Sequence, residues 1–424
     1  MKVLVIGGGG REHALVWKLA VSPRISKLYA APGSFAMVGL AEAVDIAPDE
    51  ISRLVSFAWD KKIDLTVVGP ELPLTLGIVD RFQEAGLRIV GASRRAAEIE
   101  GSKVFMKELL ARYKIPTAPF QVFTDPDEAV RYVRSQSRPL VVKADGLAAG
   151  KGVVVCHDTE TAVSALESIM KKRVFGSSGD RVLIEDCLVG EEASFLALTD
   201  GETVAPLATS QDHKAVFDND KGPNTGGMGA YSPAPVVDER LHKTIMEEIM
   251  IPTVKAMKAE DRQYRGVLYA GIMVTQGRPF VLEFNARFGD PEAQAIIPRL
   301  ESDLLELLEA TADRRLAEVK PVWKPCPAVC VVTASPGYPG DYLKGKVING
   351  LDDVAKLENT VVFHAGTRGA GNHVLTDGGR VLGVTALGKD IPQAIDRAYQ
   401  AVGHLKFEGM HYRRDIGQKA LKYL

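Results

Sequence analysis

The chain has 424 residues, 46% of them hydrophobic and 25% charged, and a formal net charge of −2. This length predicts two to four domains of a globular protein, and the balanced charge lacks the basic excess of a nucleic-acid binder. No apolar run approaches the roughly 18 residues of a membrane helix, and MKVLVIGGGG is too short an apolar start for a signal peptide. We expect a cytoplasmic protein, a monomer by default, with no nucleic-acid or membrane partner.

The N-terminal residues alternate strand-like and helical patterns. Strands are expected at 3–6, 27–31, 65–69 and 87–91, with amphipathic stretches between them. This rhythm predicts a doubly wound parallel sheet, in which ligands bind at the carboxyl ends of the strands. The turn IGGGGREH lies at such an end, where a helix N-terminus suits a phosphate. Alternatively, its glycines serve only the geometry of the turn, and Glu12 breaks the dinucleotide fingerprint.

A glycine-rich loop, DGLAAGKG, separates two expected strands at 139–144 and 152–156. A Walker A loop needs four residues between its glycines and then Gly-Lys-Ser/Thr, and this loop has neither. A hairpin loop of this kind still lets backbone N–H groups approach phosphate oxygens. Lys143, at the end of the first strand, would add a positive charge. The alternative is a flexible hairpin with exposed lysines.

A third strand is expected at 181–186, and it leads through a short linker to Glu191 and Glu192. The backbone of such a linker can pair with an adenine edge, and an acid a few residues later can accept hydrogen bonds from both ribose hydroxyls. Acids that follow strands are also commonly just solvated, so this signal is weak alone.

The stretch FVLEFNARFGDPEAQ (280–294) places Glu283 and Asn285 on one face of a strand, with Arg287 continuing that face. A carboxylate and an amide oxygen side by side are suitable ligands for Mg²⁺ that bridges nucleotide phosphates. A half-exposed edge strand is the alternative reading, but inward-facing polar groups without partners would be costly.

The proline-rich passage 319–328 marks a late boundary, followed by expected strands AVCVVTA, TVVFHAG and VLGVTALG and a final helix from Pro392 to His404. We therefore expect an N-terminal Rossmann-like domain at 1–102, a central domain at 103–325 and a C-terminal α+β domain at 326–424. A small lid-like subdomain is expected at about 120–190 within the central domain.

Several of these motifs together resemble the ATP-grasp ligases. Blocks along the whole chain are similar to the glycinamide ribonucleotide synthetase family: IGGGGREHAL, VVGPELPL, EGSKVFMKE, KADGLAAGKGVVV, TSQDHKAVFDNDKGPNTGGMGAYSPAP, EFNARFGDPEAQ and SPGYPGDY. The resemblance implies an N-terminal doubly wound parallel sheet, a central two-part ATP-grasp unit and a small C-terminal α+β domain. It also implies ATP-dependent ligation of glycine to 5-phosphoribosylamine in purine biosynthesis, through glycyl phosphate.

The resemblance also assigns residues. The ATP-binding set is Lys103, Lys143, Gly146, Gly150, Lys151, Gly152, Glu185, Asp186, Leu188 and Glu192. The metal ligands are Glu283 and Asn285, for Mg²⁺ with Mn²⁺ as a substitute. Substrate-binding residues are Gly8, Gly9, Gly10, Arg11, Glu12, Lys214, Gly226 and Gly227, and the catalytic residues are Arg287, Asp212 and Asp290. His213 can be either a base or a structural hydrogen-bonding residue. The glycines of TGGMG (225–229) predict a loop whose backbone N–H groups close over the substrate; the alternative is a tight turn.

One departure concerns the metal. Many ATP-grasp proteins carry a further acid on the strand before E-x-N, whereas 266–274 contains none. The number of ions and the third ligand are thus open. Alternatives to the glycine ligase are another ATP-grasp purine ligase with a different carboxylate, and a nucleotide-binding module without catalysis. A nicotinamide-dependent oxidoreductase is disfavoured by Glu12.

Overall fold

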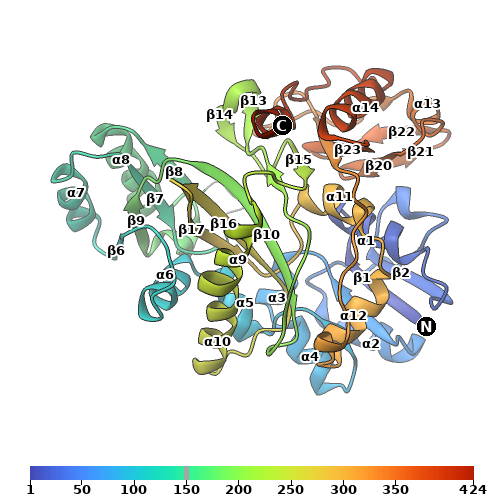
Figure 1. The fold of residues 1–424 in the computed structure, drawn as a ribbon, viewed down its shortest axis with the longest axis horizontal. Coiled ribbons are helices and arrows are strands. Elements are labelled where there is room, and N and C mark those ends of the chain that lie inside the picture. The colour runs from blue at the N-terminus through green and yellow to red at the C-terminus, as the bar shows by residue number, and fades with distance from the viewer. Residues whose placement is uncertain (148–151) are drawn as a thin grey trace.

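The computed structural model describes residues 1–147 and 152–424 (Figure 1). Its N-terminal part is a parallel sheet in the order β3-β2-β1-β4-β5. The strands are β1 (Lys2–Gly7), β2 (Lys27–Pro32), β3 (Glu42–Ala43), β4 (Leu65–Val68) and β5 (Ile89–Val90), joined by α1 (Gly10–Leu19), α2 (Ile51–Lys61), α3 (Glu71–Thr75) and α4 (Ile78–Glu84). The predicted doubly wound sheet is confirmed. Because the strand order reverses at β1, the ends of β1 and β4 form the edge that such sheets use for ligands.

Both faces of this sheet are buried. Leu4 and Ile6 belong to one hydrophobic core, and Val3 and Val5 belong to another on the opposite face. This explains why β1 is an unbroken apolar run. The first of these cores also includes Phe284, far beyond residue 102. This core therefore continues across the predicted limit at residue 102. The predicted domain limits stay predictions.

Two helices, α5 (Arg94–Gly101) and α6 (Lys103–Arg112), lead into a small antiparallel sheet in the order β6-β9-β7-β8. Its strands are β6 (Phe120–Phe123), β7 (Leu140–Ala144), β8 (Val153–Cys156) and β9 (Val182–Asp186), and α7 (Pro126–Arg134) and α8 (Thr159–Leu166) pack on it around a separate core. Three of these strands were expected. The expectation missed β6, because this short edge strand directly follows the prolines of a segment that reads as a connector.

The larger central sheet is antiparallel, in the order β11-β10-β16-β17. It consists of β10 (Glu191–Thr199), β11 (Val204–Pro206), β16 (Gly266–Thr275) and β17 (Arg278–Asn285). The helices α9 (Glu239–Ile245) and α10 (Ile251–Ala259) share a core with it (Figure 1). Along β16, residues 269, 271 and 273 point to the same face, because side chains alternate along a strand.

The C-terminal sheet has the order β12-β15-β18-β23-β20 and carries α14 (Ile391–His404). Its strands are β12 (Gln211–Asp212), β15 (Gly229–Ser232), β18 (Ala328–Ala334), β20 (Thr360–His364) and β23 (Arg380–Leu387). Shorter elements are β13 (Ala215–Phe217), β14 (Lys221–Asn224), α11 (Glu292–Ile296), α12 (Leu304–Ala312), β19 (Val347–Ile348), α13 (Leu351–Val354), β21 (Thr367–Ala370) and β22 (His373–Thr376). Two strands of this sheet come from the central part of the sequence, so the segment 211–232 is anchored in the C-terminal sheet.

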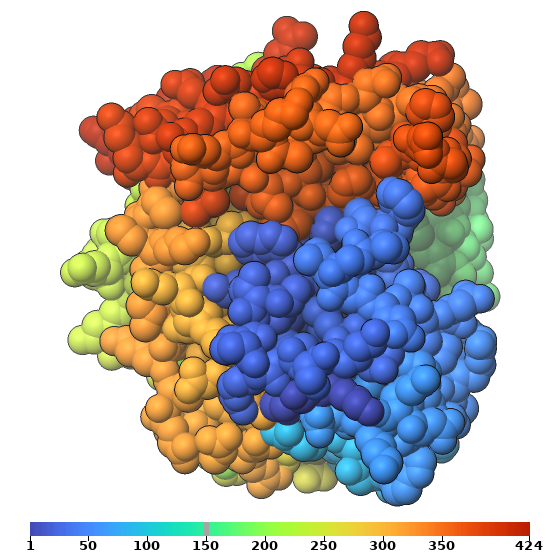
Figure 2. All heavy atoms as spheres, turned by 90° about the vertical axis from the view of Figure 1, so that its right-hand side faces the viewer, coloured from blue at the N-terminus to red at the C-terminus, as the bar shows by residue number. Residues whose placement is uncertain are grey.

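Figure 2 shows the blue N-terminal residues packed directly against the orange and red C-terminal part. The backbone N–H of His364 donates to Nδ1 of His13 at 2.9 Å across this contact. Within the described ranges, no helix combines the length and the apolar character needed to cross a membrane.

Candidate active site

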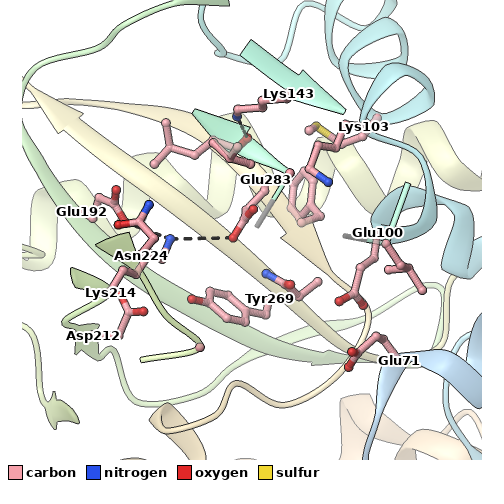
Figure 3. A pocket seen from close by; sticks show the side chains of 18 of the residues that line it. Glu71, Glu100, Lys103, Lys143, Glu192, Asp212, Lys214, Asn224, Tyr269 and Glu283 are labelled. Atoms are coloured by element: carbon pink, nitrogen blue, oxygen red, sulfur yellow. Dashed lines mark hydrogen bonds and ion pairs between the residues drawn. The ribbon is translucent and has the colours of Figure 1, made fainter. Parts of the chain in front are cut away.

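A cavity of about 630 Å³ lies between the small sheet and the larger antiparallel sheet. Figure 3 shows the side chains of 18 of the residues that line it. One end has apolar walls from β7, β8, β16 and β17, made of Val141, Val153, Val155, Met273 and Leu282. The other end is charged and is lined by residues of the N-terminal, central and C-terminal parts: Arg11, Glu71, Asp290, Glu292 and Arg380. The cavity can therefore hold a ligand with a flat apolar part and a charged part.

Two lysines reach the apolar end. Lys103, the first residue of α6, donates from Nζ to the carbonyl of Gly146 at 2.8 Å. Lys143 on β7 lies 2.5 Å from Oε1 of Glu185 and donates to the carbonyl of Leu282 at 3.1 Å. Burial lowers the pKa of Lys103, although Glu283 opposes the shift. Both ammonium groups line the cavity and can contact an anion there.

Glu185, a predicted ATP-binding residue, lines the cavity, and its side chain forms ion pairs within the protein. Its carboxylate is 2% exposed and lies between the ammonium groups of Lys107 and Lys143. Lys107 is fully buried, and burial lowers its pKa to about 8, while Glu185 opposes that shift. Glu185 thus holds two lysines in place. Lys107 is absent from the predicted set, although it follows Lys103 by one helical turn on α6.

The end of β9 and the linker after it border the cavity. Asp186, Cys187 and Leu188 line the cavity, as does Glu192 at the start of β10. Gly146 and Gly152, which flank the glycine-rich loop, also line it. The predicted residues Gly150 and Lys151 lie outside the described residues.

The predicted metal ligands share one face of β17. Glu283 and Asn285 both line the cavity, as alternation along the strand requires. Burial works against ionisation of Glu283, but the positive charges of Lys214, Lys143 and Lys103 bring its pKa to about 2. Within the described ranges, no group of three or more His, Cys, Asp or Glu side chains is arranged to hold a metal ion. One carboxylate and one amide oxygen fit Mg²⁺ that takes its remaining ligands from phosphate and water.

Lys214 lies among acids in the middle of the cavity (Figure 3). Its Nζ is 2.9 Å from Oε2 of Glu192 and 3.7 Å from Oε1 of Glu283. Burial raises the pKa of the neighbouring Asp212 to about 8; Lys214 opposes this shift, and nearby acids led by Glu292 reinforce it. Asp212 is therefore suited to exchange a proton near neutral pH.

His213, between these two residues, points into protein. It is fully buried, its Nδ1 lies 3.4 Å from the carbonyl of Gly229, and burial lowers its pKa to about 3. This placement favours the structural reading over that of a base.

Arg287 is held between two acids from the N-terminal part. Its Nε donates to Glu71 at 3.2 Å, and its Nη2 lies 3.3 Å from Glu100 and donates to Oδ1 of Asn285 at 3.2 Å. Burial opposes the guanidinium charge, but Glu100 and Glu71 raise its pKa further above the usual value. Arg287 is therefore a fixed cation that also orients the amide of Asn285.

At the charged end, Arg380 from β23 joins two loops. Its Nη1 donates at 2.8 Å to the carbonyls of both Gly226 and Asp290, and its Nη2 lies 3.1 Å from Oδ2 of Asp290. Gly227, with φ of +116°, has no room for a Cβ, which would lie 2.4 Å from Pro291. The predicted residues Asp290, Gly226 and Gly227 are thus brought together by an arginine that sequence reasoning missed.

In the glycine turn after β1, neighbouring atoms leave no room for a side chain at Gly8 or Gly10. A Cβ on Gly8 would lie 2.2 Å from the carbonyl oxygen of Gly33, and one on Gly10 would lie 2.6 Å from Nε2 of Gln294. Glu12 accepts a hydrogen bond from the N–H of Gly9 at 2.7 Å, while Arg11 lines the cavity. Packing therefore accounts for these glycines, and their predicted contact with a substrate phosphate stays a prediction.

Two further cavity residues were not predicted. Glu292, at the start of α11, is 2% exposed and accepts hydrogen bonds from Tyr269 at 2.6 Å and Ser194 at 3.0 Å. Glu100 lies at the end of α5. Nothing in their local sequence separates these acids from solvated ones, because their burial arises only when distant elements meet.

Comparison with known proteins agrees with this architecture. The phosphoribosylglycinamide synthetase models match the chain at residues 1–100 (N domain), 101–293 (ATP-grasp domain) and 328–419 (C domain). The chain belongs to the phosphoribosylglycinamide synthetase family. The predicted family, fold class and class of enzyme, an ATP-grasp carboxylate–amine ligase, are thereby confirmed.

Individual members of the phosphoribosylglycinamide synthetase family match over nearly the full length. The phosphoribosylamine–glycine ligase of Vibrio vulnificus is 52% identical, with 99% of each chain covered. The crystal structure of the phosphoribosylamine–glycine ligase of Thermotoga maritima superposes with a TM-score of 0.86 at 31% identity, covering 98% of this chain and 100% of that one. A biotin carboxylase domain from Hydrogenobacter thermophilus, in complex with MgADP, shares the fold alone: its TM-score is 0.74 at 18% identity, with 97% and 91% covered.

Proposed function

We propose that the chain joins glycine to 5-phosphoribosylamine in an ATP-dependent reaction of purine biosynthesis, giving glycinamide ribonucleotide, ADP and phosphate. The observation that carries this proposal is one continuous cavity whose apolar end holds Lys103 and Lys143 and whose charged end holds Arg287 and Asp290. An ATP at the first end would direct its phosphates toward a small carboxylate at the second. Family membership supports the choice of glycine and phosphoribosylamine as substrates.

At the nucleotide end, we assign adenine to the backbone of 186–188 and the ribose hydroxyls to Glu192. Lys103 and Lys143 would contact the phosphates, which is the task of fixed cations in phosphoryl transfer. The walls formed by Val155, Met273 and other apolar side chains would enclose the base.

Glu283 and Asn285 would hold the divalent ion, which we propose to be Mg²⁺ with Mn²⁺ as a substitute. When bound, such an ion would supply positive charge that stabilises the negative charge developing on the phosphoryl group during transfer. Arg287, which donates to Asn285 at 3.2 Å, would keep the amide oxygen oriented for this purpose.

Two steps follow. A carboxylate oxygen of glycine attacks the γ-phosphorus of ATP, so that glycyl phosphate forms and ADP leaves; the guanidinium of Arg287 would bind the carboxylate. The amine of phosphoribosylamine then attacks the acyl carbon, phosphate leaves, and the nitrogen loses a proton. Asp212, whose pKa is raised by burial and which is therefore more basic than an ordinary carboxylate, would accept that proton, and Asp290 would bind the ammonium group of glycine.

Phosphate release from ATP and Mg²⁺ tests the proposal, with glycine and freshly made phosphoribosylamine added separately and together. We expect release only when both are present, with glycinamide ribonucleotide found by mass. Equal release with another small carboxylate in place of glycine would instead support the related ligase that acts on a different carboxylate. The monomeric state, the cytoplasmic location and the lack of other partners stay predictions from the sequence.

A further inference from the structure

Lys214 occupies an unusual position between two functional carboxylates. It follows β12, whereas Glu192 is the second residue of β10 and Glu283 lies on β17. Its ammonium lies 2.9 Å from Oε2 of Glu192 and 3.7 Å from Oε1 of Glu283, and Figure 3 shows it directed at Glu283. One side chain thus spans the acid assigned to the ribose and the acid assigned to the metal.

The strand register explains why a cation fits there. Glu192 pairs with Met273, and Glu283 pairs with Gly271, so the two acids flank β16 on the face that lines the cavity. Gly271 has no side chain, and a Cβ there would lie 3.2 Å from Cγ of Glu283. Lys214 places its positive charge between these two acids, on the face of β16 that lines the cavity.

We propose that Lys214 is a positioning residue that neutralises Glu283 until ATP and the metal arrive together, so that free enzyme binds divalent metal poorly. This inference rests on the proposed function, in which Glu192 binds ribose and Glu283 binds the metal. A metal ion that enters without nucleotide must displace an ammonium from Glu283, and the two cations repel each other at short range.

Binding of Mn²⁺ alone to the full chain, without nucleotide, tests the inference by the loss of the free-ion electron paramagnetic resonance signal. We expect Lys214→Met to bind Mn²⁺ at least tenfold more tightly than the unmodified chain. Lys214→Arg keeps the charge and should remain within about twofold of it. Adding Glu283→Gln to the Lys214→Met chain should abolish the gain. If Lys214→Met does not fold, Lys214→Gln provides the same neutral replacement.

Two results would overturn the inference: an unchanged Mn²⁺ affinity in both neutral variants, or a gain that survives Glu283→Gln. Neither result would contradict the proposed function, which is tested separately by substrate-dependent phosphate release; turnover of the Glu283→Gln chain tests the metal assignment. Near-normal turnover of that variant would instead remove Glu283 as the metal ligand. A purely structural role of Lys214 predicts no increase in metal affinity.

Discussion

Acid should weaken the contact between the N-terminal and C-terminal parts of the molecule through His13. Nδ1 of His13 accepts a hydrogen bond from the N–H of His364, which requires a neutral ring at that nitrogen. Burial, reinforced by His364, lowers the pKa of His13 from 6.5 to about 4. As the pH falls, His13 therefore takes up a proton near pH 6.5 in the unfolded chain but only near pH 4 in the folded chain. The stabilisation is complete above the unfolded pKa and is lost as the pH falls toward the folded one.

The size of the effect follows from these two values. At about pH 5 the difference in proton binding corresponds to a loss of roughly 2 kcal/mol in the free energy of unfolding, from His13 alone. Urea unfolding at about pH 7.5 and about pH 5 measures it. His13→Asn keeps an acceptor oxygen without titrating, so its stability should fall by roughly 2 kcal/mol less over the same interval. His373→Asn, at an exposed site, should behave as the unmodified chain. Parallel pH dependence in the unmodified chain and His13→Asn would refute the reasoning.

Three further predictions concern the site. Glu283→Ala should reduce turnover by more than the roughly 10- to 100-fold typical of residues that only support a metal ligand, with an unchanged circular dichroism spectrum; near-normal turnover would contradict the metal assignment. Lys143→Ala should weaken ATP binding about 10- to 100-fold, the value of a charge-assisted hydrogen bond, measured by calorimetry; unchanged affinity would remove Lys143 from the phosphate site. Arg380→Met should raise KM for glycine or phosphoribosylamine but not for ATP. The control Arg397→Met removes an arginine that donates to the carbonyl of Leu387 in the C-terminal part, and it should leave these KM values unchanged. Equal KM values in the two variants would argue against a positioning role for Arg380.

Local patterns were sufficient for much of the fold. The apolar run of β1 reflects burial on two faces, and the alternation along β17 is enough by itself to place Glu283 and Asn285 on a common face. The edge strand β6 could not be predicted in this way, because the prolines that precede it dominate the local signal.

Contacts between distant elements explain the residues that sequence reasoning missed. Lys107 shares a helix face with Lys103, but its partner Glu185 lies on β9, and only the packing of α6 against that strand makes the pair. Arg380 reaches Gly226 across 154 positions of sequence, and no spacing rule links them. Glu185 was predicted at the site, but the enclosure of its carboxylate by two lysines was not, because that enclosure exists only in the assembled sheet.

The most direct test of the central claim follows an oxygen atom. Glycine labelled with ¹⁸O in its carboxyl group is incubated with the chain, ATP, Mg²⁺ and phosphoribosylamine, and the released phosphate is analysed by mass. Ligation through glycyl phosphate predicts that one labelled oxygen passes to phosphate while glycinamide ribonucleotide retains the other. Unlabelled phosphate, or phosphate released without the amide product, would contradict the account.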